Sequence, residues 1–575
     1  MTVTPTAASV WPQLEPVLTG VRKPARYVGG EGNAVVKDHA GVTSAWLLIY
    51  PDAYELGQPN QGLQILYEVL NERPATVAER GYAPWPDMEQ VMREKAIPFF
   101  RLENHLPLRA FDVAAFSLAT ELGYTNLLNC LDLGGLAVAG ADHVDERRHR
   151  LGVGRRVPAW YEPGHSSDGR LRGTFPRQRA APYRVPKRTV SDLDRWPYPK
   201  KAIVRLTETV HERYNVKIFR GGTRGCCFCQ AGMTTRPVRE RSRQTIKEMV
   251  RRGVEATGFE DAGVVGPAQT EQADLLGLCG DLADAYEGTA TSLSLPSTRV
   301  DAFNVTLADE LIRNGRRTGL TFAPEVGSER VRRVINKMVS EADMLRAADT
   351  AFANRWRPPQ AVLHDRPADR DRRRRARRRR PGAEGPGRRP PVRPPQQGHR
   401  LGRRLRAQAA QAVPVGRPGN AAAAAAQARP HQGPGRVRAQ PEPALPPAAA
   451  GGGGGAAGPR RPPGDGHGAA RVPAGARFDG WDEHFDYGVW ARAAEQTGVD
   501  VAWYTTPQRG EGGVFPWDHL DSGLEKDWLW RDWCDALAGS ELEDCRWTPC
   551  YDCGVCPGLG PQHQTGHLPI YAGPR

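Results

Sequence analysis

Apolar positions in residues 41–145 switch between the spacing of buried strands and that of amphipathic helices. The apolar run AWLLIY at 45–50 ends at a proline, and FDVAAFSLA at 111–119 is a second strand-like run. The segments GLQILYEVL at 62–70 and TNLLNCLDL at 125–133 space their apolar residues three and four apart, as one helix face does. This alternation predicts a small doubly wound α/β domain over residues 41–145, preceded by an extension at 1–40.

The loop PDAYELGQPN at 51–60 follows the first predicted strand of this domain. In doubly wound folds, ligands bind at the carboxyl edge of the sheet, which is where this loop is expected. The loop has no glycine-rich phosphate-binding pattern, so a ligand-binding domain and a purely structural one both remain open. Residues 146–205 are rich in Arg, Gly and Pro and are interpreted as a connector.

A second alternating region covers residues 206–356. Strand-like runs occur at 291–297 and 319–325, and helical periodicity occurs at 243–253, 302–315, 328–338 and 341–353. Strands that alternate with helices of this length favour a parallel sheet with peripheral helices. The sequence therefore predicts a second α/β domain, open or closed as a partial barrel.

Residues 357–477 differ in composition from the rest of the chain. They contain 26 Arg, no Lys and 6 acidic residues, and they lack Ile, Met, Phe, Tyr, Trp, Ser, Thr and Cys. Although the whole chain carries a net charge of +14, the remainder without this stretch is mildly acidic. Such a stretch cannot bury enough apolar surface to fold, and one interpretation is a disordered arm that binds RNA or DNA. The absence of Lys, Ser and Thr instead favours GC-rich DNA translated out of frame.

Ordinary composition returns in residues 478–575, which we interpret as a helical, aromatic-rich C-terminal module. No apolar run is long enough for a membrane span, and the first residues lack a signal-peptide pattern, so the prediction is a cytoplasmic protein without a membrane partner. Seven of the ten cysteines fall into two groups, Cys226, Cys227 and Cys229 and then Cys545, Cys550, Cys553 and Cys556. Grouped cysteines in a reducing compartment indicate metal ligands.

The first group lies in a loop whose spacing is close to C-x3-C-x2-C. Three thiolates at that spacing hold three irons of a [4Fe-4S] cluster and leave the fourth iron for S-adenosylmethionine (SAM). Cys226 and Cys229 supply the C-x2-C half, but Gly222 stands at the first cysteine position. Cys227 follows Cys226 directly and is expected to point elsewhere, so it is not a substitute.

The second group, CRWTPCYDCGVC at 545–556, has the spacing C-x4-C-x2-C-x2-C. Four cysteines within twelve residues fit either a structural zinc site or an auxiliary iron-sulfur cluster, and spacing alone does not choose between them. We favour a second cluster because the first loop already has the pattern of an iron-sulfur protein. Cys130 and Cys279 are expected to pack inside helices.

Several long motifs in this order resemble the radical SAM family whose members carry an N-terminal cobalamin-binding-like domain. They are APWPDMEQVMREKAIPFF, KRTVSDLDRWPYPKK, RGGTRGCCFCQAGMTTRPVRERS, SLSLPSTRVDAF and TFAPEVGSERVRRVINKMVSEADML. The resemblance implies a [4Fe-4S] cluster, SAM, and a reductant such as a flavodoxin or ferredoxin. It further implies reductive cleavage of SAM to a 5′-deoxyadenosyl radical that acts on a substrate the motifs do not identify.

The resemblance also assigns site residues. Cys226 and Cys229 become cluster ligands, Phe228 shields the cluster, and the side of the sheet that faces SAM is lined by Ser294, Arg299, Glu325, Gly327 and Ser328. An alternative for the last three residues is a structural strand end at which Ser328 and Glu329 cap a helix. No D-x-H-x-x-G motif for a cobalt-ligating histidine occurs in the N-terminal domain, so the sequence argues against cobalamin.

The family places a strand similar to LYFMTGLPTETDE shortly after Trp356. Codons can be written for residues 361–372 that, shifted by one base, encode LYFMTGLPTET, a coincidence that a genuine arm does not predict. We therefore expect a frameshift over about 357–477 and an impaired enzyme. One alternative is a non-catalytic nucleic-acid-binding protein that uses the Arg-rich arm, although no sequence feature outside that stretch supports nucleic-acid binding. The other is a structural remnant held together by a metal ion at the C-terminal cysteines.

Overall fold

A computed structural model gives the fold of the chain. It describes residues 8–136, 150–151, 161–165, 171–176, 181–265, 275–294, 310, 313, 321–353, 360–363, 475–497, 510–515, 517–545 and 552–556. Nearly all of the Arg-rich stretch 357–477, the predicted helix at 302–315 except two residues, Arg299 and Cys550 lie outside this description. Within the described part, no helix combines the length and the apolar character needed to cross a membrane.

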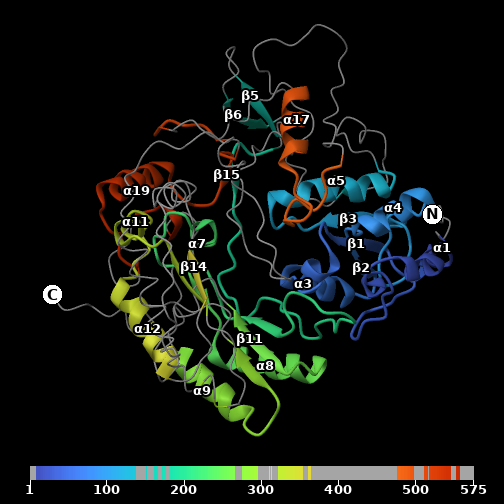
Figure 1. The fold of residues 1–575 in the computed structure, drawn as a ribbon, viewed down its shortest axis with the longest axis horizontal. Helices are drawn as coiled ribbons and strands as arrows, with labels where there is room; N and C mark the ends of the chain where they lie inside the picture. Colours follow the sequence, from blue (N-terminus) through green and yellow to red (C-terminus); the bar gives the residue numbers. More distant parts are fainter. Residues whose placement is uncertain are drawn as a thin grey trace, which may run out of the picture.

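The N-terminal domain is a parallel sheet with helices packed on it, as the alternation predicted (Figure 1). The strands are β1 (Ser44–Tyr50), β2 (Thr76–Tyr82), β3 (Val113–Phe116) and β4 (Arg150–Leu151), in the order β2-β1-β3-β4. The helices are α1 (Trp11–Leu14), α2 (Tyr54–Gly57), α3 (Gln61–Asn71), α4 (Pro86–Glu94) and α5 (Tyr124–Leu133). Short 3-10 turns cover Glu15–Gly20, Pro24–Arg26, His39–Gly41, Leu108–Ala110 and Glu121–Gly123.

Strand β2 is absent from the sequence prediction, and its composition explains why. It reads TVAERGY, yet Glu79 and Arg80 are almost fully buried. Arg80 forms ion pairs with Glu31 and, at 2.7 Å, with Glu103. Each buried charge therefore has a partner from another segment, and pairs of that kind leave no periodic signal in the strand itself.

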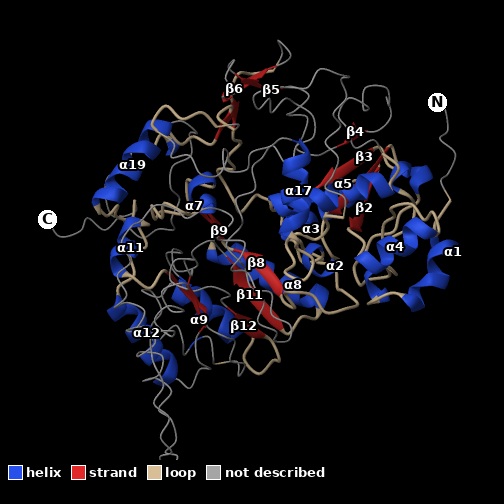
Figure 2. Cartoon of the chain, turned by 45° about the horizontal axis from the view of Figure 1, so that its top comes forward, coloured by secondary structure: helices blue, strands red, loops and turns tan. Residues whose placement is uncertain are grey.

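The second domain contains the parallel sheet β12-β11-β8 (Figure 2). Its strands are β8 (Tyr214–Lys217), β11 (Asp261–Val265) and β12 (Ser292–Ser294), with α8 (Arg243–Thr257) and α9 (Leu275–Ala285) packed on them. Helix α8 begins where the Ser242 side chain accepts a hydrogen bond from the Thr245 amide at 3.2 Å, and it ends at Gly258, whose φ is 67°. These devices are ordinary helix boundaries.

The remaining elements of this domain lie around that sheet. They are the antiparallel pair β9 (Phe219–Arg220) and β10 (Arg239–Glu240), α7 (Gln230–Thr234), α11 (Glu329–Val334), α12 (Glu341–Ala353), and the parallel pair β13 (Thr321–Glu325) and β14 (Gln360–Leu363). The predicted strand at 319–325 and the helix at 341–353 are confirmed. Strand β14 lies inside the stretch 357–477, so the expectation that this whole stretch is unfolded is wrong at its first residues, where β13 supplies a pairing partner.

The C-terminal part of the chain divides between the two domains (Figure 1). Helix α17 (Tyr487–Thr497) lies over the N-terminal domain, whereas α19 (Lys526–Ala538) lies beside α11. Strand β15 (Leu520–Asp521) pairs with β7 (Val185–Pro186), and β5 (Tyr161–His165) pairs with β6 (Leu171–Pro176). The described parts of residues 478–575 thus pack on two different parts of the chain.

Candidate iron-sulfur site

The first cysteine group lies in a tight loop that follows the carboxyl end of the sheet. This cysteine loop, residues 221–229, runs from the end of β9 to the start of α7. It begins at Gly221, whose φ is +102°, and a Cβ at that position would lie 2.5 Å from the carbonyl oxygen of Pro237. Only glycine fits this turn, which fixes where the loop leaves the sheet.

The three cysteines of the loop have different surroundings, and all are half-buried. The Cys229 thiol accepts a hydrogen bond from the amide of Gly232 at 3.2 Å, as the N-cap of α7. The Cys226 thiol lies 3.4 Å from the carbonyl oxygen of Asn336. The Cys227 thiol lies 3.6 Å from the carbonyl of Gly225, and burial, reinforced by the Asp532 carboxylate, raises its pKa to about 12. Cys227 is therefore a poor source of thiolate.

Position 222 has room for the missing side chain. A Cβ on Gly222 would lie 3.4 Å from the Cα of Gly232 and 3.9 Å from its carbonyl oxygen, which are ordinary contacts. The neighbouring Gly225 is different, because a Cβ there would come within 2.4 Å of a Leu542 methyl group. The loop thus keeps the shape that a cysteine at 222 requires.

The residues present do not complete a three-thiolate site. Among the residues that the structure describes, no group of three or more His, Cys, Asp or Glu side chains is arranged to hold a metal ion. Cys226 and Cys229 supply two of the three thiolates that a SAM-binding [4Fe-4S] cluster needs. The chain as it stands does not fit that cluster.

Glu325 lies near this loop through a lysine that the sequence analysis missed. Its carboxylate, at the end of β13, accepts a hydrogen bond from Lys337 at 3.0 Å. The Lys337 ammonium also lies 5.7 Å from the centre of the Phe228 ring, which is 47% exposed. Lys337 therefore links Glu325, a predicted SAM residue, to Phe228 in the cysteine loop. It lies twelve positions after Glu325 in the sequence.

Three other predicted SAM residues, Ser294, Gly327 and Ser328, lie in the described part of the chain. The Ser294 hydroxyl accepts a hydrogen bond from Arg213 at 2.9 Å, and Arg213 precedes β8, at the amino edge of the sheet. The Gly327 carbonyl oxygen lies 3.2 Å from the Arg332 guanidinium. Ser328 is the N-cap of α11, but its hydroxyl makes no capping hydrogen bond. Among the described members of this set, Glu325 is the one that contacts a residue lying over the loop, Lys337.

The C-terminal cysteines pack against the same loop. The Cys545 amide donates to the carbonyl oxygen of Thr223 at 3.2 Å, and Arg224 forms a 3.0 Å ion pair with buried Asp544. The side chain of Asn336 pairs with both backbone groups of Leu542, at 2.9 and 3.0 Å. Two cysteine groups more than 300 residues apart in sequence therefore lie side by side.

Arg236 connects the cysteine loop to this C-terminal group. Its guanidinium is 1% exposed, donates to the Arg224 carbonyl at 2.9 Å and lies 3.8 Å from the Cys553 sulfur. Burial raises the pKa of Cys545 to about 12, and the charges of Cys556 and Cys553 act in the same direction against that of Arg236. Arg236 thus contacts Cys553 of the C-terminal group, while Cys550 lies outside the description.

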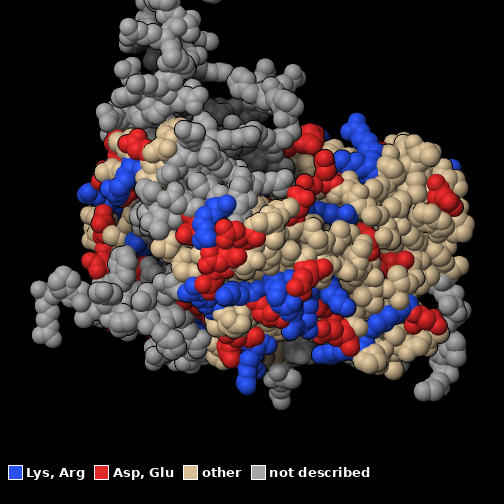
Figure 3. Space-filling model, turned by 90° about the horizontal axis from the view of Figure 1, so that it is seen from below, with Lys and Arg blue, Asp and Glu red and all other residues tan. Residues whose placement is uncertain are grey.

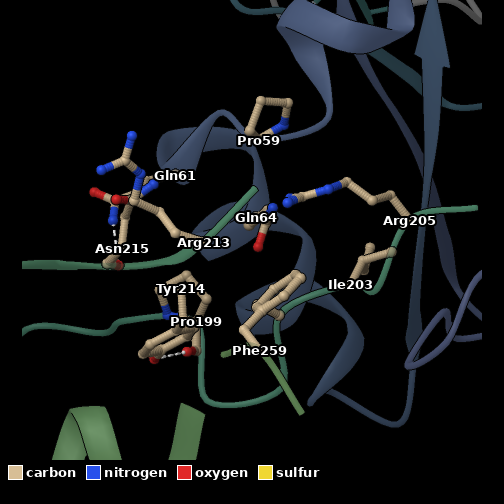
Figure 4. Close-up of a pocket in the computed structure, with 11 residues that line it drawn as sticks. Pro59, Gln61, Gln64, Pro199, Ile203, Arg205, Arg213, Tyr214, Asn215 and Phe259 are labelled. Atoms are coloured by element: carbon tan, nitrogen blue, oxygen red, sulfur yellow. Dashed lines mark hydrogen bonds between the residues drawn. The ribbon is translucent and has the colours of Figure 1, made fainter. Parts of the chain in front are cut away.

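A further pocket lies at the opposite edge of the sheet (Figure 4). Gln61 and Gln64 of α3 line it together with Arg205, Arg213 and Phe259. Asn215, near the start of β8, also lines it, whereas the cysteine loop follows the carboxyl ends. The pocket is therefore a junction between domains and is not part of the cysteine site.

One face of the molecule shows how charge is distributed on the described part. Basic and acidic side chains alternate over it (Figure 3). On α8 and α9, Asp281 pairs with both Arg243 and Lys247, and Glu248 pairs with Arg251 at 2.7 Å. Interspersed charges of this kind do not form the single-sign stripe expected of a nucleic-acid-binding face.

Comparison with known proteins identifies the class. Residues 62–150 match the family described as radical SAM proteins, N-terminal, and residues 216–364 match the radical SAM superfamily. The second match begins in β8, includes the cysteine loop and ends one residue after β14. Residues 62–150 and 216–364 thus match domains of the radical SAM family, whose enzymes use a [4Fe-4S] cluster and SAM.

Individual relatives match shorter or more distant stretches. The uncharacterized protein MJ0966 of Methanocaldococcus jannaschii is 32% identical over 136 residues, which are 24% of this chain and 29% of that protein. The radical SAM methyltransferase TsrM from Kitasatospora setae, solved with cobalamin and a [4Fe-4S] cluster, aligns with 56% of this chain and 69% of its own at 10% identity and a TM-score of 0.36. The cobalamin-dependent enzyme OxsB aligns with 56% and 49% at 8% identity and a TM-score of 0.35.

Proposed function

We propose that this chain derives from an enzyme that cleaves SAM reductively at a [4Fe-4S] cluster, and that the chain itself is impaired in that reaction. Within the family, such cleavage yields methionine and a 5′-deoxyadenosyl radical, which abstracts hydrogen from the substrate. The observation that carries the proposal is Gly222, which has the space but not the thiol of a cluster ligand. Cys226 and Cys229 retain the other two ligand positions.

Residues around the loop support a binding role for SAM in the parent enzyme. The Glu325 carboxylate lies at the carboxyl end of β13, where catalytic groups of parallel folds collect. We assign it, with Gly327 and Ser328, to the SAM side, and Lys337 holds its carboxylate until a ligand competes. Arg299 belongs to the same proposed set, whereas the Ser294 hydroxyl is bound to Arg213 at the amino edge of the sheet. Phe228 would cover the cluster.

The experiment compares wild type with Gly222→Cys, and Gly222→Ser serves as the control of similar size without a thiol. Each chain is reconstituted anaerobically with iron and sulfide, reduced, and examined by EPR with and without SAM. We expect a signal that responds to SAM only in Gly222→Cys, with an iron content closest to four. Equal iron and an identical SAM response in wild type, Gly222→Ser and Gly222→Cys would show that Gly222 is not the defect.

A second variant in the same experiment tests the stretch 357–477. We propose that it is read out of frame, since the superfamily match stops at residue 364, eight residues into the stretch of biased composition. A chain with both Gly222→Cys and a repaired frame should form 5′-deoxyadenosine in the presence of a flavodoxin or ferredoxin reductant. A genomic locus with no insertion or deletion near codon 357 would overturn the frameshift.

The C-terminal cysteines are a second candidate metal site. The Cys553 sulfur lies 3.8 Å from the Arg236 guanidinium, which favours binding of an anionic metal-thiolate group. We propose that Cys545, Cys553 and Cys556, with Cys550, hold either a second iron-sulfur cluster or zinc. Metal analysis of the purified chain separates the two, and Cys553→Ser should lower the bound metal, whereas exposed Cys534→Ser should not.

A further inference from the structure

The carboxyl edge of the N-terminal sheet is covered by residues from the far end of the chain. We call residues 476–490 the closing segment. Phe478 in this segment is 1% exposed and belongs to the hydrophobic core that β1 and β3 share. Figure 1 shows the same relationship, because the orange C-terminal helix α17 stands over the cyan helix α5. A segment buried to this degree is part of the domain's packing.

The closing segment contacts residues that follow three parallel strands in turn. Beyond β1, the Asp52 carboxylate accepts a hydrogen bond from the Trp481 indole at 2.8 Å. Beyond β3, at the start of α5, the Asn126 side-chain oxygen accepts one from the Phe478 amide at 2.8 Å. Beyond β2, the ring of Trp85 lies against the closing segment. The contacts therefore run across the whole edge.

Aromatic packing around Trp85 fills the space above β2. Its ring centre lies 4.8 Å from that of Phe478, 5.0 Å from that of Trp481 and 4.8 Å from that of His484. The Arg26 guanidinium lies 4.7 Å from the same ring. Aromatic rings at these separations are in direct contact, so no layer of solvent or ligand lies between them.

Polar side chains of the closing segment form hydrogen bonds and an ion pair with the N-terminal domain. The Asp479 carboxylate accepts hydrogen bonds from Thr125 of α5, at 2.9 Å, and from Trp490, at 3.3 Å. Asp479 is 6% exposed, and Arg477 forms a 3.3 Å ion pair with Glu89 on α4. Buried charges that find specific partners indicate a defined docking geometry and not a loose hydrophobic contact.

We infer that the carboxyl edge of the N-terminal sheet is the docking site for the closing segment, and that cobalamin does not bind there. Ligands of doubly wound domains bind at this edge, where Asp52, Trp85 and Asn126 lie. All three of these residues are bound by the closing segment. The cavity lined by Arg26, Tyr54 and Tyr82 has a volume of about 20 Å³, enough for about one water molecule and far too small for a cofactor. A corrin ring has no place to lie against the strand ends.

Hydrogen–deuterium exchange on the full chain tests the docking, and it does not depend on the state of the iron-sulfur site. The Phe478 amide should be strongly protected in wild type. Asn126→Ala removes its acceptor and should speed its exchange at least tenfold, and Trp481→Phe should have a smaller effect in the same direction. Asn60→Ala is the matched control, because the Asn60 side chain caps α3 through the Leu63 amide, a hydrogen bond that does not involve the closing segment, and its loss should leave the Phe478 amide unchanged.

Equilibrium dialysis with hydroxocobalamin tests the exclusion. Wild type and Asn60→Ala should show no saturable binding. Saturable binding to wild type, or a Phe478 amide that exchanges as fast as in an unfolded peptide, would overturn the inference. So would an exchange rate that neither Asn126→Ala nor Trp481→Phe alters, since docking would then not use the strand ends.

Discussion

The backbone amide of Cys545 donates to the carbonyl oxygen of Thr223 across 3.2 Å, which joins the C-terminal cysteines to the loop beside Gly222. Arg236 and Asn336 add side-chain contacts on either side of this hydrogen bond. The loop is thus held by residues that are synthesised last. Substitutions in the C-terminal segment should consequently alter the stability of the cysteine loop.

Asn336→Ala should loosen this junction. The side chain is 4% exposed and makes two hydrogen bonds to Leu542, so its loss should destabilise the docked segment by about 1–3 kcal/mol. The measurement is hydrogen exchange of residues 541–545, which should become faster while exchange in α5 stays unchanged. Unchanged exchange at 541–545 would mean that other contacts alone hold the segment.

Alkylation should distinguish the buried thiols from the exposed one. The pKa values of Cys227 and Cys545 are raised to about 12, so at pH 8 about one thiol in ten thousand is ionised. Cys534 is exposed on α19. In metal-free protein, iodoacetamide should modify Cys534 at least about 100-fold faster than Cys227 or Cys545, as followed by peptide mass spectrometry. The difference should vanish in urea.

Lys217 should make stability depend on alkaline pH. Burial, together with the positive charge of Arg220, lowers its pKa from 10.5 to about 8 in the folded chain. Between these two values the unfolded chain binds more protons than the folded one, so stability rises with pH by up to about 3 kcal/mol. Lys217→Met should abolish this component of the rise in urea unfolding between pH 8 and pH 10.5. Parallel pH curves for the two proteins would contradict the prediction.

The two members of a buried ion pair in the N-terminal domain should not be equally important. Glu79 lies 2.6 Å from Arg101 and also binds His39 and Asn104. Glu79→Gln leaves the buried Arg101 without its closest counter-charge and should cost about 3–5 kcal/mol. Arg101→Met leaves Glu79 with two partners and should cost less. Urea unfolding of the full chain measures both, and equal losses would show that His39 and Asn104 do not compensate.

Local patterns predicted the elements whose own residues carry the signal. The apolar run at 45–50 became β1, and the helical spacing at 341–353 became α12. Strand β2 escaped because Glu79 and Arg80 are neutralised by residues of other segments, Arg101 and Glu103 among them. A single-sequence pattern records polarity at each position and carries no information on the distant partner.

Of the candidate site, the sequence predicted the spacing of the cysteines but not the tertiary contacts around them. The cysteine motif and the departure at Gly222 were visible in the sequence, and the position of Glu325 followed from the family resemblance. The contacts of Lys337 with Glu325 and Phe228 join three segments, and Asn336 pairs with a residue 206 positions away. Such contacts arise from tertiary packing, which leaves no repeating pattern in the amino-acid sequence.

The hydrogen bond between Asn126 and the Phe478 amide spans 352 positions of sequence, which has a consequence for biosynthesis. Ribosomes add about 5–20 residues per second. The N-terminal sheet therefore emerges and folds while its aromatic edge at Trp85 stays uncovered for roughly 20–70 seconds. During that interval the edge is a natural target for chaperones, and premature termination anywhere before residue 478 releases a domain with that edge permanently bare.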